Sequence, residues 1–272
     1  MTTSPRPCSP QRARELAVKT DQLLGIDQIF IRHASDSQRT AEPVSTQGTR
    51  SSGKPSTTGV SPRTLVPAPP IESSDDGPSE QRLEHLRKLH EEQCPHCSQT
   101  SSHQNIVFGE GNPDADLMFV GEAPGVEEDR TGRPFVGRAG QKLDEMIKAM
   151  GFTRDQVYIA NVLKARPPEN RTPLQHEVDA CGPYLAAQSR IIKPQIIVAL
   201  GGPAAKLLLK TETGITRLRG RWGQYDDGKG KRPVMPTFHP AYLLRNPTLE
   251  VRGQVWEDLK AVLDRMGRSV PG

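Results

Sequence analysis

The chain of 272 residues carries a formal charge of +4, from 36 Lys and Arg against 32 Asp and Glu, and only 34% of its residues are hydrophobic. This length suits one or two domains, the charge is compatible with a polyanionic partner, and the low hydrophobic share indicates that part of the chain does not pack. No apolar run approaches the ~18 residues of a membrane span, and the first residues lack an apolar signal core, so we expect a cytoplasmic protein with no membrane partner.

The first 80 residues differ in composition from the rest of the chain. Within residues 1–33, Leu16, Leu23 and Phe30 recur at heptad spacing, which predicts a short helix that Gly25 weakens. Residues 34–80 are dominated by Ser, Thr, Pro and Gly and contain no aromatic residue. Such a segment cannot bury enough apolar surface to offset its ordering entropy. We therefore predict a disordered linker there and a folded domain over residues 81–272.

The folded domain alternates between strand-like and helix-like patterns. Apolar runs predict four strands, at residues 116–121, 156–162, 195–201 and 232–238. Helices are predicted at residues 138–150, from an N-cap at Thr172-Pro173 to about Ile192, at 202–210, and from Asn246-Pro247 to about Met266. This alternation is typical of an α/β fold with a mostly parallel sheet, in which ligands bind at the carboxyl ends of the strands.

Polar and glycine-rich segments follow the predicted strands. They are GEAPGVEEDRTGRPFVGRAG at 121–140, NVLKARPPENRTP at 161–173, Gly201-Gly202, and HPAYLLRNP at 239–247. Taken singly, each has an ordinary interpretation: GEAPG as a turn, Asn161 as a turn cap, Phe135 as a core residue and His239 as a structural one. Their joint placement at one edge of the sheet favours a binding site.

The side chains at this edge suit recognition of a nucleobase. The amide of Asn161 offers both a donor and an acceptor to the edge of a base, and the ring of Phe135 can stack on its face. The imidazole of His239 can stabilise negative charge on a departing carbonyl oxygen. No Ser-His or Cys-His pair that would activate a nucleophile is apparent in these segments.

Five motifs, in the right order, resemble those of the family 4 uracil-DNA glycosylases, the iron–sulfur branch of that superfamily: GEAPGVEED, RPFVGRAG, NVLKARPPENR, ITRLRGRW and PTFHPAYLLRNP. The resemblance runs from about Leu83 to Arg265. It implies a three-layer α/β/α fold around a four-stranded, mostly parallel sheet. It also implies a monofunctional glycosylase that hydrolyses the N-glycosidic bond of deoxyuridine in DNA without a catalytic metal. We expect a monomer that acts on uracil-containing DNA.

The resemblance assigns roles around the base. Phe135 would stack on the flipped uracil, Asn161 would hydrogen-bond its amide edge and exclude cytosine, and His239 would stabilise the departing uracil anion. The remaining residues of the pocket, as the resemblance places them, belong to the loops after the first two strands. The backbone of Gly121, Glu122 and Ala123 would line the pocket, Glu128 would crowd the 5-position and reject thymine, and Glu122 or Asn170 would position the hydrolytic water.

The expected DNA contacts come from two later segments and from the Asn161 loop. Residues 206–232 are the densest basic stretch of the chain, although such a run is most often a solvated face. Leu243, Leu244 and Arg245 would lie at the DNA surface, where a wedge fills the gap left by the flipped base. Phosphate contacts are expected from Lys164, Arg166, Arg219 and Arg221.

The cysteines depart from the pattern of the resembled family, which holds a [4Fe–4S] cluster with four cysteines. Cys94, Cys97 and Cys181 match three of them, whereas Ala165 stands where the third belongs. Three cysteines can hold a cluster with an open iron, a three-iron cluster, or one completed by another ligand. The candidates for that ligand are His96, His103 and Cys8. We expect a structural iron–sulfur cluster; the alternative is that the cysteines are buried thiols or bind zinc.

Two other classes of protein remain open. A catalytically silent nucleic-acid-binding relative would bind DNA without releasing a base, and Ala165 would be its first sign of decay. A small-molecule α/β module would use the glycine-rich loop for phosphate. The segment GEAPG lacks the Gly-Lys-Ser/Thr ending of a P-loop and the three-glycine fingerprint of a dinucleotide site. The glycosylase is therefore our prediction.

Overall fold

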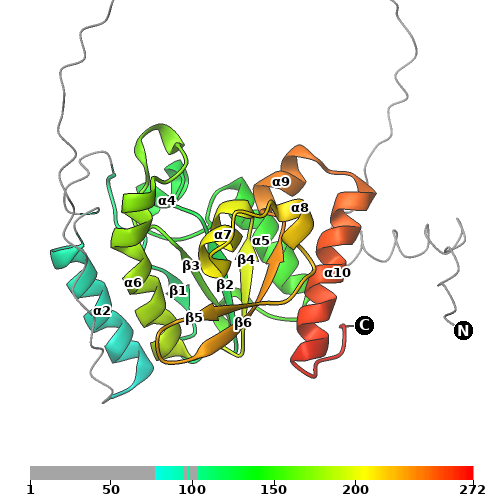
Figure 1. The fold of residues 1–272 in the computed structure, drawn as a ribbon, viewed down its shortest axis with the longest axis horizontal. Helices are drawn as coiled ribbons and strands as arrows, with labels where there is room; N and C mark the ends of the chain where they lie inside the picture. Colours follow the sequence, from blue (N-terminus) through cyan, green and yellow to red (C-terminus); the bar gives the residue numbers. More distant parts are fainter. Residues whose placement is uncertain (1–76, 95–96, 98–102, 272) are drawn as a thin grey trace, which may run out of the picture.

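The computed structural model describes residues 77–94, 97 and 103–271 (Figure 1). The helix predicted within residues 1–33 and nearly all of the linker predicted at 34–80 lie outside the described residues. The predicted end of the linker is wrong by two positions, because Ser79 and Glu80 already form the first turn of α2 (Ser79–Gln93). Across the described residues, no helix is long and apolar enough to cross a bilayer.

A six-stranded sheet with the order β1-β3-β2-β4-β6-β5 forms the centre of the fold. The middle four strands are parallel and the two edge strands are antiparallel to their neighbours. The strands are β1 (Glu110–Gly111), β2 (Leu117–Gly121), β3 (Tyr158–Asn161), β4 (Ile196–Leu200), β5 (Gly223–Asp226) and β6 (Lys231–Thr237). The four predicted strands are confirmed as the middle four. The edge strands were missed because β1 has two residues and β5 reads Gly-Gln-Tyr-Asp, which gives no apolar period.

Alternate residues of each parallel strand enter two separate cores, one on each face of the sheet. In β2, Met118 and Val120 belong to one core, and Leu117 and Phe119 belong to the other. All five residues of β2 are buried, as expected for a parallel strand covered on both faces. The predicted α/β/α layering is therefore confirmed.

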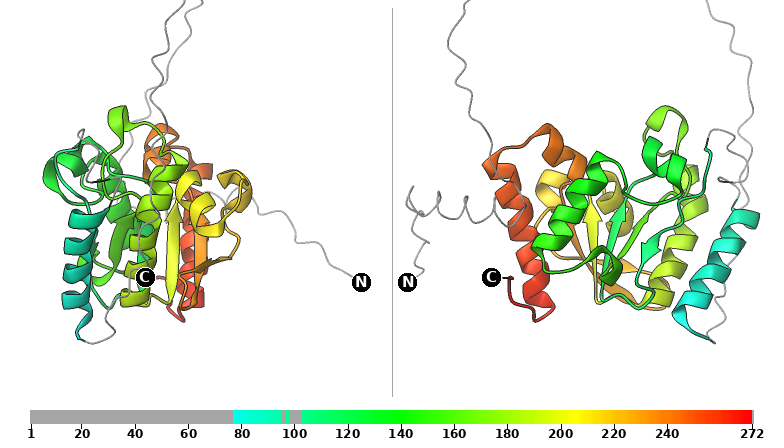
Figure 2. Two further views of the ribbon diagram at one scale, coloured as in Figure 1. Left: turned by 60° about the vertical axis from the view of Figure 1, so that its left-hand side comes forward. Right: turned by 180° about the vertical axis from the view of Figure 1, so that it is seen from behind.

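Helices cover both faces (Figure 2). The first core includes residues of α2, α6 (Gln175–Ile192) and α7 (Gly202–Leu209), and the second includes residues of α5 (Arg138–Ala149) and α10 (Leu249–Arg265). The short elements are α4 (Val126–Thr131), η1 (Arg154–Gln156), η2 (Pro168–Asn170), α8 (Ile215–Leu218) and α9 (Pro240–Arg245). In Figure 1, α2 lies alongside α6 at the outer edge of its layer, and the two helices are in contact.

Two predicted helix starts are wrong, each because a later residue supplies the cap. Helix α6 begins after Leu174, whose backbone N–H donates to the carboxylate of Glu177 at 2.8 Å, rather than at Thr172-Pro173. Helix α10 begins after Thr248, whose hydroxyl accepts from the N–H of Val251 at 3.2 Å. Asn246 instead ends α9, since its side-chain amide donates to the carbonyl of Tyr242 at 3.2 Å.

Candidate active site

The parallel register brings the loops of the sequence-predicted site to one end of the sheet. Gly121 at the end of β2 pairs directly with Asn161 at the end of β3. The backbone N–H of Gly201, just after β4, donates to the carbonyl of Thr237 at the end of β6 at 2.9 Å. A cavity of 620 Å³ opens beside these strand ends. Its lining includes Glu122, Ala123, Asn170, His239 and Arg245.

Two of the proposed base-recognition groups, the Asn161 amide and the Phe135 ring, meet at Gly121, and the third lies beside Phe135. A Cβ built on this glycine would lie 2.4 Å from Oδ1 of Asn161 and 2.5 Å from Cζ of Phe135. The ring of Phe135 in turn lies 5.7 Å from that of His239, with 31° between the two planes. The absence of a side chain at Gly121 is therefore what allows the amide and the phenyl ring to meet, next to the imidazole.

Asn161 holds an unpaired buried acceptor. Its side chain is 2% exposed, and Oδ1 has no hydrogen-bond partner among the described residues. Leaving a buried amide oxygen unpaired costs roughly 1–3 kcal/mol, so native proteins rarely keep one without a ligand or a water to satisfy it. Oδ1 of Asn161 is therefore available to accept a hydrogen bond from a ligand.

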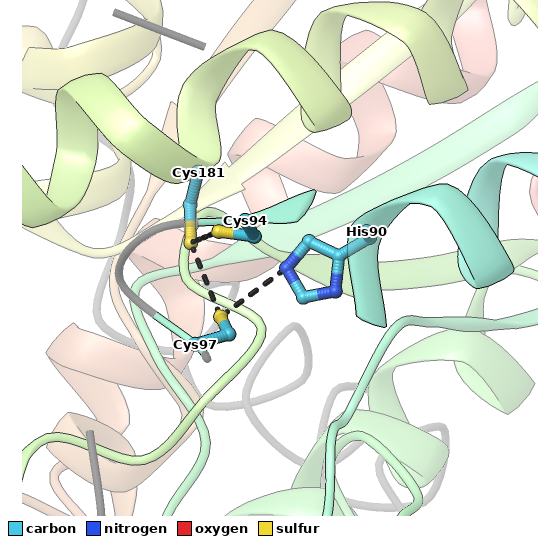
Figure 3. Close-up of side chains that lie close together, drawn as sticks. All are labelled: His90, Cys94, Cys97 and Cys181. Atoms are coloured by element: carbon cyan, nitrogen blue, oxygen red, sulfur yellow. Dashed lines mark hydrogen bonds between the residues drawn. The ribbon is translucent and has the colours of Figure 1, made fainter. Parts of the chain in front are cut away.

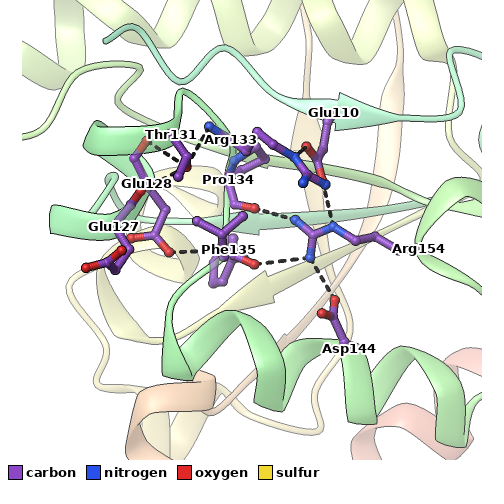
Figure 4. A network of polar contacts seen from close by, with 10 residues as sticks. Glu110, Glu127, Glu128, Thr131, Arg133, Pro134, Phe135, Asp144 and Arg154 are labelled. Carbon is purple, nitrogen blue, oxygen red and sulfur yellow. Dashed lines mark hydrogen bonds and ion pairs between the residues drawn. The ribbon is translucent and has the colours of Figure 1, made fainter. Parts of the chain in front are cut away.

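Phe135 is held in a strained backbone conformation. Its φ is +51°, in the left-handed region that a bulky residue rarely adopts. The guanidinium of Arg154 binds the strained segment from one side by donating to the carbonyl oxygens of Phe135, at 3.1 Å, and of Pro134. Figure 4 shows this guanidinium between the loop, Glu110 and Asp144. Strain of this kind persists only where surrounding contacts hold it, and it clusters at functional sites.

Glu128 holds the same loop from the other side. One carboxylate oxygen accepts from the backbone N–H groups of Val136 and Gly137 at 2.9 and 3.0 Å, and the other accepts from that of Gly125 at 3.1 Å. The carboxylate therefore connects the glycine-rich turn to the Phe135 segment. Glu128 is not among the residues that line the cavity, and its predicted role in rejecting thymine stays a prediction.

His239 is a neutral imidazole with a defined tautomer. Burial and, to a smaller extent, the positive charge of Arg245 lower the pKa of His239 to about 4, and Glu128 opposes the shift. The backbone N–H of Ala241 donates to Nδ1 at 3.1 Å, so the proton of the neutral ring is on Nε2. Gly201, at φ +90°, comes so close that a Cβ there would lie 3.0 Å from the Cβ of His239. The ring is therefore positioned as a hydrogen-bond donor through Nε2.

The two side chains expected to position the hydrolytic water, the carboxylate of Glu122 and the amide of Asn170, both lie at the cavity. Glu122 is partly buried, and this burial raises the pKa of its carboxyl above the usual range. Asn170 is exposed in a left-handed conformation at φ +54°, and its side-chain oxygen accepts from Nε of Arg166 at 2.7 Å. Both residues line the cavity. Arg166 is tied to Asn170 and lies 3.8 Å from the carboxylate of Asp129, which leaves it only partly available to DNA.

Three of the predicted DNA contacts are corrected by the structure. Lys164 is fully buried and donates to the backbone carbonyl of Asn161 at 2.7 Å and to Gln188 at 2.6 Å. Leu243 is 3% exposed and belongs to the core beneath α9. Arg219 is paired with the buried carboxylate of Asp258 at 2.6 Å. Lys164 and Leu243 are buried because their backbone positions face the core, and Arg219, with 18% of its side chain exposed, is held by its ion pair. A basic or apolar motif alone does not reveal this.

The other predicted DNA contacts are accessible. Arg221 and Arg245 are exposed, and Leu244 is partly exposed. Arg245 also lines the cavity that holds His239. The wedge and phosphate roles of these three residues stay predictions.

A second group of side chains gathers between α2 and α6 (Figure 3). The sulfur of Cys181, on α6, lies 3.6 Å from that of Cys94 and 3.7 Å from that of Cys97. Nε2 of His90, in the last turn of α2, lies 3.2 Å from the sulfur of Cys97. These four donor atoms lie within 4.8 Å of one another and can hold a metal ion. We call this group the Cys-His centre.

The Cys-His centre does not match the donor set of a four-iron cluster. Such a cluster takes one protein ligand on each of four irons, four thiolates in the resembled family, whereas this centre has three thiols and an imidazole. Ligands on four separate irons also stand farther apart than ligands that share one ion. The observed sulfur separations of 3.6 and 3.7 Å are close to the ~3.8 Å edge of a tetrahedron with metal–sulfur bonds of ~2.3 Å.

His90 was missed from the sequence, and the candidates for a fourth ligand need correction. His103 is not part of the centre, and His96 and Cys8 lie outside the described residues. The available signal was spacing: His90 precedes Cys94 by four residues, which is about one helical turn, and so shares a helix face with the following cysteine. The predicted candidates lay within the Cys-x2-Cys motif (His96), after it (His103) and near the N-terminus (Cys8), and the helix that leads into the motif was not considered.

Comparisons with known proteins identify the family to which most of the described residues are similar. A family model described as the uracil DNA glycosylase superfamily matches residues 108–260. The type-4 uracil-DNA glycosylase of Thermotoga maritima is 49% identical over 168 residues, which cover 61% of this chain and 86% of that protein. Those of Sulfurisphaera tokodaii and Archaeoglobus fulgidus are 45% and 41% identical and cover 66% and 65% of this chain, and 84% and 90% of the relatives.

Proposed function

The chain belongs to the uracil-DNA glycosylase superfamily, and from that membership we propose how the cavity at the ends of β2, β3, β4 and β6 performs the reaction. The enzyme hydrolyses the N-glycosidic bond of deoxyuridine in DNA, which releases uracil and leaves an abasic site. The base must leave the duplex stack to reach a cavity of this kind, at a cost of a few kcal/mol. In our proposal, the exposed Arg221 and Arg245 and the partly exposed Leu244 contact the DNA while the base enters the cavity.

The unpaired Oδ1 of Asn161 is the observation on which the proposal rests. Uracil carries a hydrogen on N3, and this N–H would donate to Oδ1 and satisfy it. Cytosine has no hydrogen on N3, so its binding would leave the buried oxygen unpaired. A site built around such a hydrogen bond rejects analogues that lack it by large factors, because the buried group stays desolvated and unpaired. Phe135 would stack on the face of the same ring.

His239 would stabilise the leaving group. When the bond between N1 and C1′ breaks, the electron pair stays on the base as the uracil anion, with charge on its carbonyl oxygens. The Nε2–H of the neutral imidazole would donate to the O2 atom without transferring a proton. A donor positioned in advance stabilises charge that develops in the transition state more than charge in the ground state.

Glu122 would act as the general base for the attacking water. A water molecule attacks C1′, its oxygen forms the new bond, and its proton passes to the carboxylate. The raised pKa of the partly buried Glu122 makes it a better base than an exposed carboxylate. Asn170, on the same cavity, would hold the water in line. Glu128, Arg154 and Lys164 would act as positioning residues, because they hold the backbone of Phe135 and Asn161.

The Cys-His centre would have a structural role. Its four residues lie between α2 and α6, whereas the cavity opens at the strand ends, so its metal would take no part in bond cleavage. The resemblance assigns an iron–sulfur cluster to this position, and the sulfur spacing favours a smaller occupant. We further propose that residues 81–272 form the catalytic domain and act as a monomer, since every proposed site residue comes from this part of one chain.

The test is release of free uracil by the purified full-length protein from an oligonucleotide with a single deoxyuridine. A catalytically silent relative would bind this oligonucleotide without releasing uracil, and that result would contradict the proposal. Asn161→Asp should reduce the preference for uracil over cytosine, because a carboxylate oxygen can accept from the amino group of cytosine. Asn112→Asp is the matched control, because its side-chain oxygen accepts from the N–H of Asp114 at 2.9 Å and aspartate can do the same. An unchanged preference in Asn161→Asp would remove this residue from base recognition.

A further inference from the structure

We propose that the Cys-His centre binds one Zn²⁺ ion, with His90 as its fourth ligand, in place of an iron–sulfur cluster. Three cysteine thiolates and one histidine are an established donor set of structural zinc sites. Around a single ion with bonds of ~2.3 Å to sulfur and ~2.0 Å to nitrogen, the sulfur–sulfur edges are ~3.8 Å and the sulfur–nitrogen edges ~3.5 Å. Three of the six observed edges are 3.6, 3.7 and 3.2 Å, and all four donor atoms lie within 4.8 Å of one another.

The ligands come from three places in the chain. Cys94 caps α2 and Cys97 follows it closely, His90 lies one turn earlier on the same helix, and Cys181 lies on α6. The fourth ligand therefore comes from α2, whereas the cysteine expected at residue 165 would have come from the loop after β3. Ala165 is fully buried and belongs to the same core as the three cysteines, so the place of the missing thiol is filled by packing.

All four ligands are shielded from solvent. His90, Cys94 and Cys181 are fully buried and Cys97 is 4% exposed. A closed site with four protein ligands is typical of structural zinc, because a catalytic ion keeps a position open for water or substrate. The imidazole of His90 is oriented by aromatic contacts, with the ring of Tyr184 edge-on at 4.7 Å and that of Phe108 at 5.9 Å.

The ion would connect α2 to α6. Helix α2 buries only Leu83, Leu86 and His90 along its 15 residues, which is a small apolar contact. A metal ion bound by His90, Cys94 and Cys181 would connect the two helices through coordination bonds, where side-chain packing between them is limited. Coordination free energy in structural zinc sites contributes directly to folding.

The first experiment measures metal and acid-labile sulfide in full-length protein made in medium that contains both iron and zinc. The proposal expects about one zinc per chain and no acid-labile sulfide. Iron and sulfide in comparable amounts would overturn it in favour of a cluster, and a protein without bound metal would overturn it in favour of free thiols. Metal content is independent of uracil release, so this result and the proposed function can fail separately.

The second experiment tests His90 itself with Co²⁺ added to metal-free protein. Tetrahedral Co²⁺ with thiolate ligands gives characteristic visible bands. His90→Ala should weaken Co²⁺ binding by at least about tenfold, since even residues that only support a ligand contribute that much. His90→Cys should retain binding and shift the bands toward four thiolates, which covers the case in which the alanine variant does not fold. His85→Ala, exposed on the same helix, is the control. Wild-type bands and affinity in both His90 variants would exclude it as a ligand.

Discussion

The base pocket and the Cys-His centre are both assembled from distant parts of the chain, but different physical constraints position them. The pocket is placed by the sheet: Gly121 and Asn161 are register partners at the ends of β2 and β3, and His239 follows β6. The centre is placed by helix packing, with His90 on α2 and Cys181 on α6. Backbone hydrogen bonds fix the first arrangement whatever the side chains are, whereas the second depends on a thin helix contact.

Each region holds a buried atom with no hydrogen-bond partner among the described residues, Oδ1 of Asn161 in one and Nδ1 of His90 in the other. Oδ1 of Asn161 is the atom to which the proposed substrate would donate, whereas the four donor atoms of the centre lie within 4.8 Å of one another. Changes in the pocket should therefore alter chemistry more than folding, and changes in the centre should alter folding more than chemistry. The following predictions test that division, from the largest expected effect on uracil release to the smallest.

His239→Ala should have the largest effect. Loss of the Nε2 donor should slow single-turnover uracil release by about 10²–10³-fold, the usual effect of removing one group that stabilises a developing anion. The melting temperature should change little, because His239 contributes one hydrogen bond, from Ala241. The control is His176→Ala, since His176 is exposed near the start of α6. Wild-type rates for His239→Ala would remove the imidazole from the site.

Gly121→Ala should have the next largest effect. The added Cβ would displace the Asn161 amide and the Phe135 ring, which lie 2.4 and 2.5 Å from its position. A displacement of about 1 Å in a catalytic site can cost about 10²-fold in rate. The destabilisation should stay within the ~1–3 kcal/mol of an overpacked core. Gly182→Ala, where a Cβ meets no atom within 4 Å, is the control. Equal rates in the two variants would contradict the convergence of the pocket on Gly121.

Arg221→Ala and Arg219→Ala should separate a DNA contact from a structural pair. Exposed Arg221 should act on DNA binding, so its loss should weaken binding severalfold and reduce the slope of log affinity against log salt by about 1. Arg219→Ala should mainly lower stability, by about 3 kcal/mol, because it leaves the buried Asp258 carboxylate without its partner. Filter binding at several salt concentrations and urea unfolding distinguish the two. If Arg219→Ala weakened DNA binding and Arg221→Ala lowered stability, Arg219 would be the DNA contact.

Removal of the metal should change uracil release less than twofold when rates are measured below the new melting temperature. The melting temperature itself should fall by roughly 5–15 °C, as expected for loss of a tightly bound ligand from a domain of this size. Hydrogen exchange should increase first in α2, at residues 79–93. A chelator with matched ionic strength and readdition of the metal provide the controls. A large loss of uracil release on metal removal, with α2 still protected from hydrogen exchange, would contradict a structural role for the metal.

The smallest effect should be that of pH on the His239 site. Because burial lowers the pKa of His239 to about 4 from 6.5, the unfolded chain binds a proton at a higher pH than the folded one does. Its contribution to stability is therefore fully present above about pH 6.5 and decreases as the pH falls toward 4. His239→Asn should lose less melting temperature over this window than the wild type. Uracil release should depend little on His239 ionisation between pH 6 and 8, where the ring stays neutral, and a rate rising with its protonation would contradict the neutral donor.

The corrected residues show why sequence patterns identify a site better than they orient its side chains. Lys164 lies in a motif with the expected composition, but its position beyond β3 points it inward, where it holds the carbonyl of Asn161. Leu243 and Leu244 are neighbours on α9, so a turn of about 100° per residue buries the first and leaves the second partly exposed. Arg219 and Arg221, in the turn after α8, also differ in exposure, because Arg219 pairs with Asp258 on α10 and Arg221 is exposed.

The sequence by itself determined the positions of the four middle strands, the α/β class, and the placement of Gly121, Asn161 and His239 at strand ends on one edge of the sheet. These follow from local periodicity and from a general property of parallel sheets, which gather their strand ends at one edge. Only the tertiary structure decided that His90 joins the cysteines, that Phe135 is strained, and that Lys164 is buried. Each of these depends on contacts between residues far apart in the chain, and such contacts leave no periodic trace in the sequence.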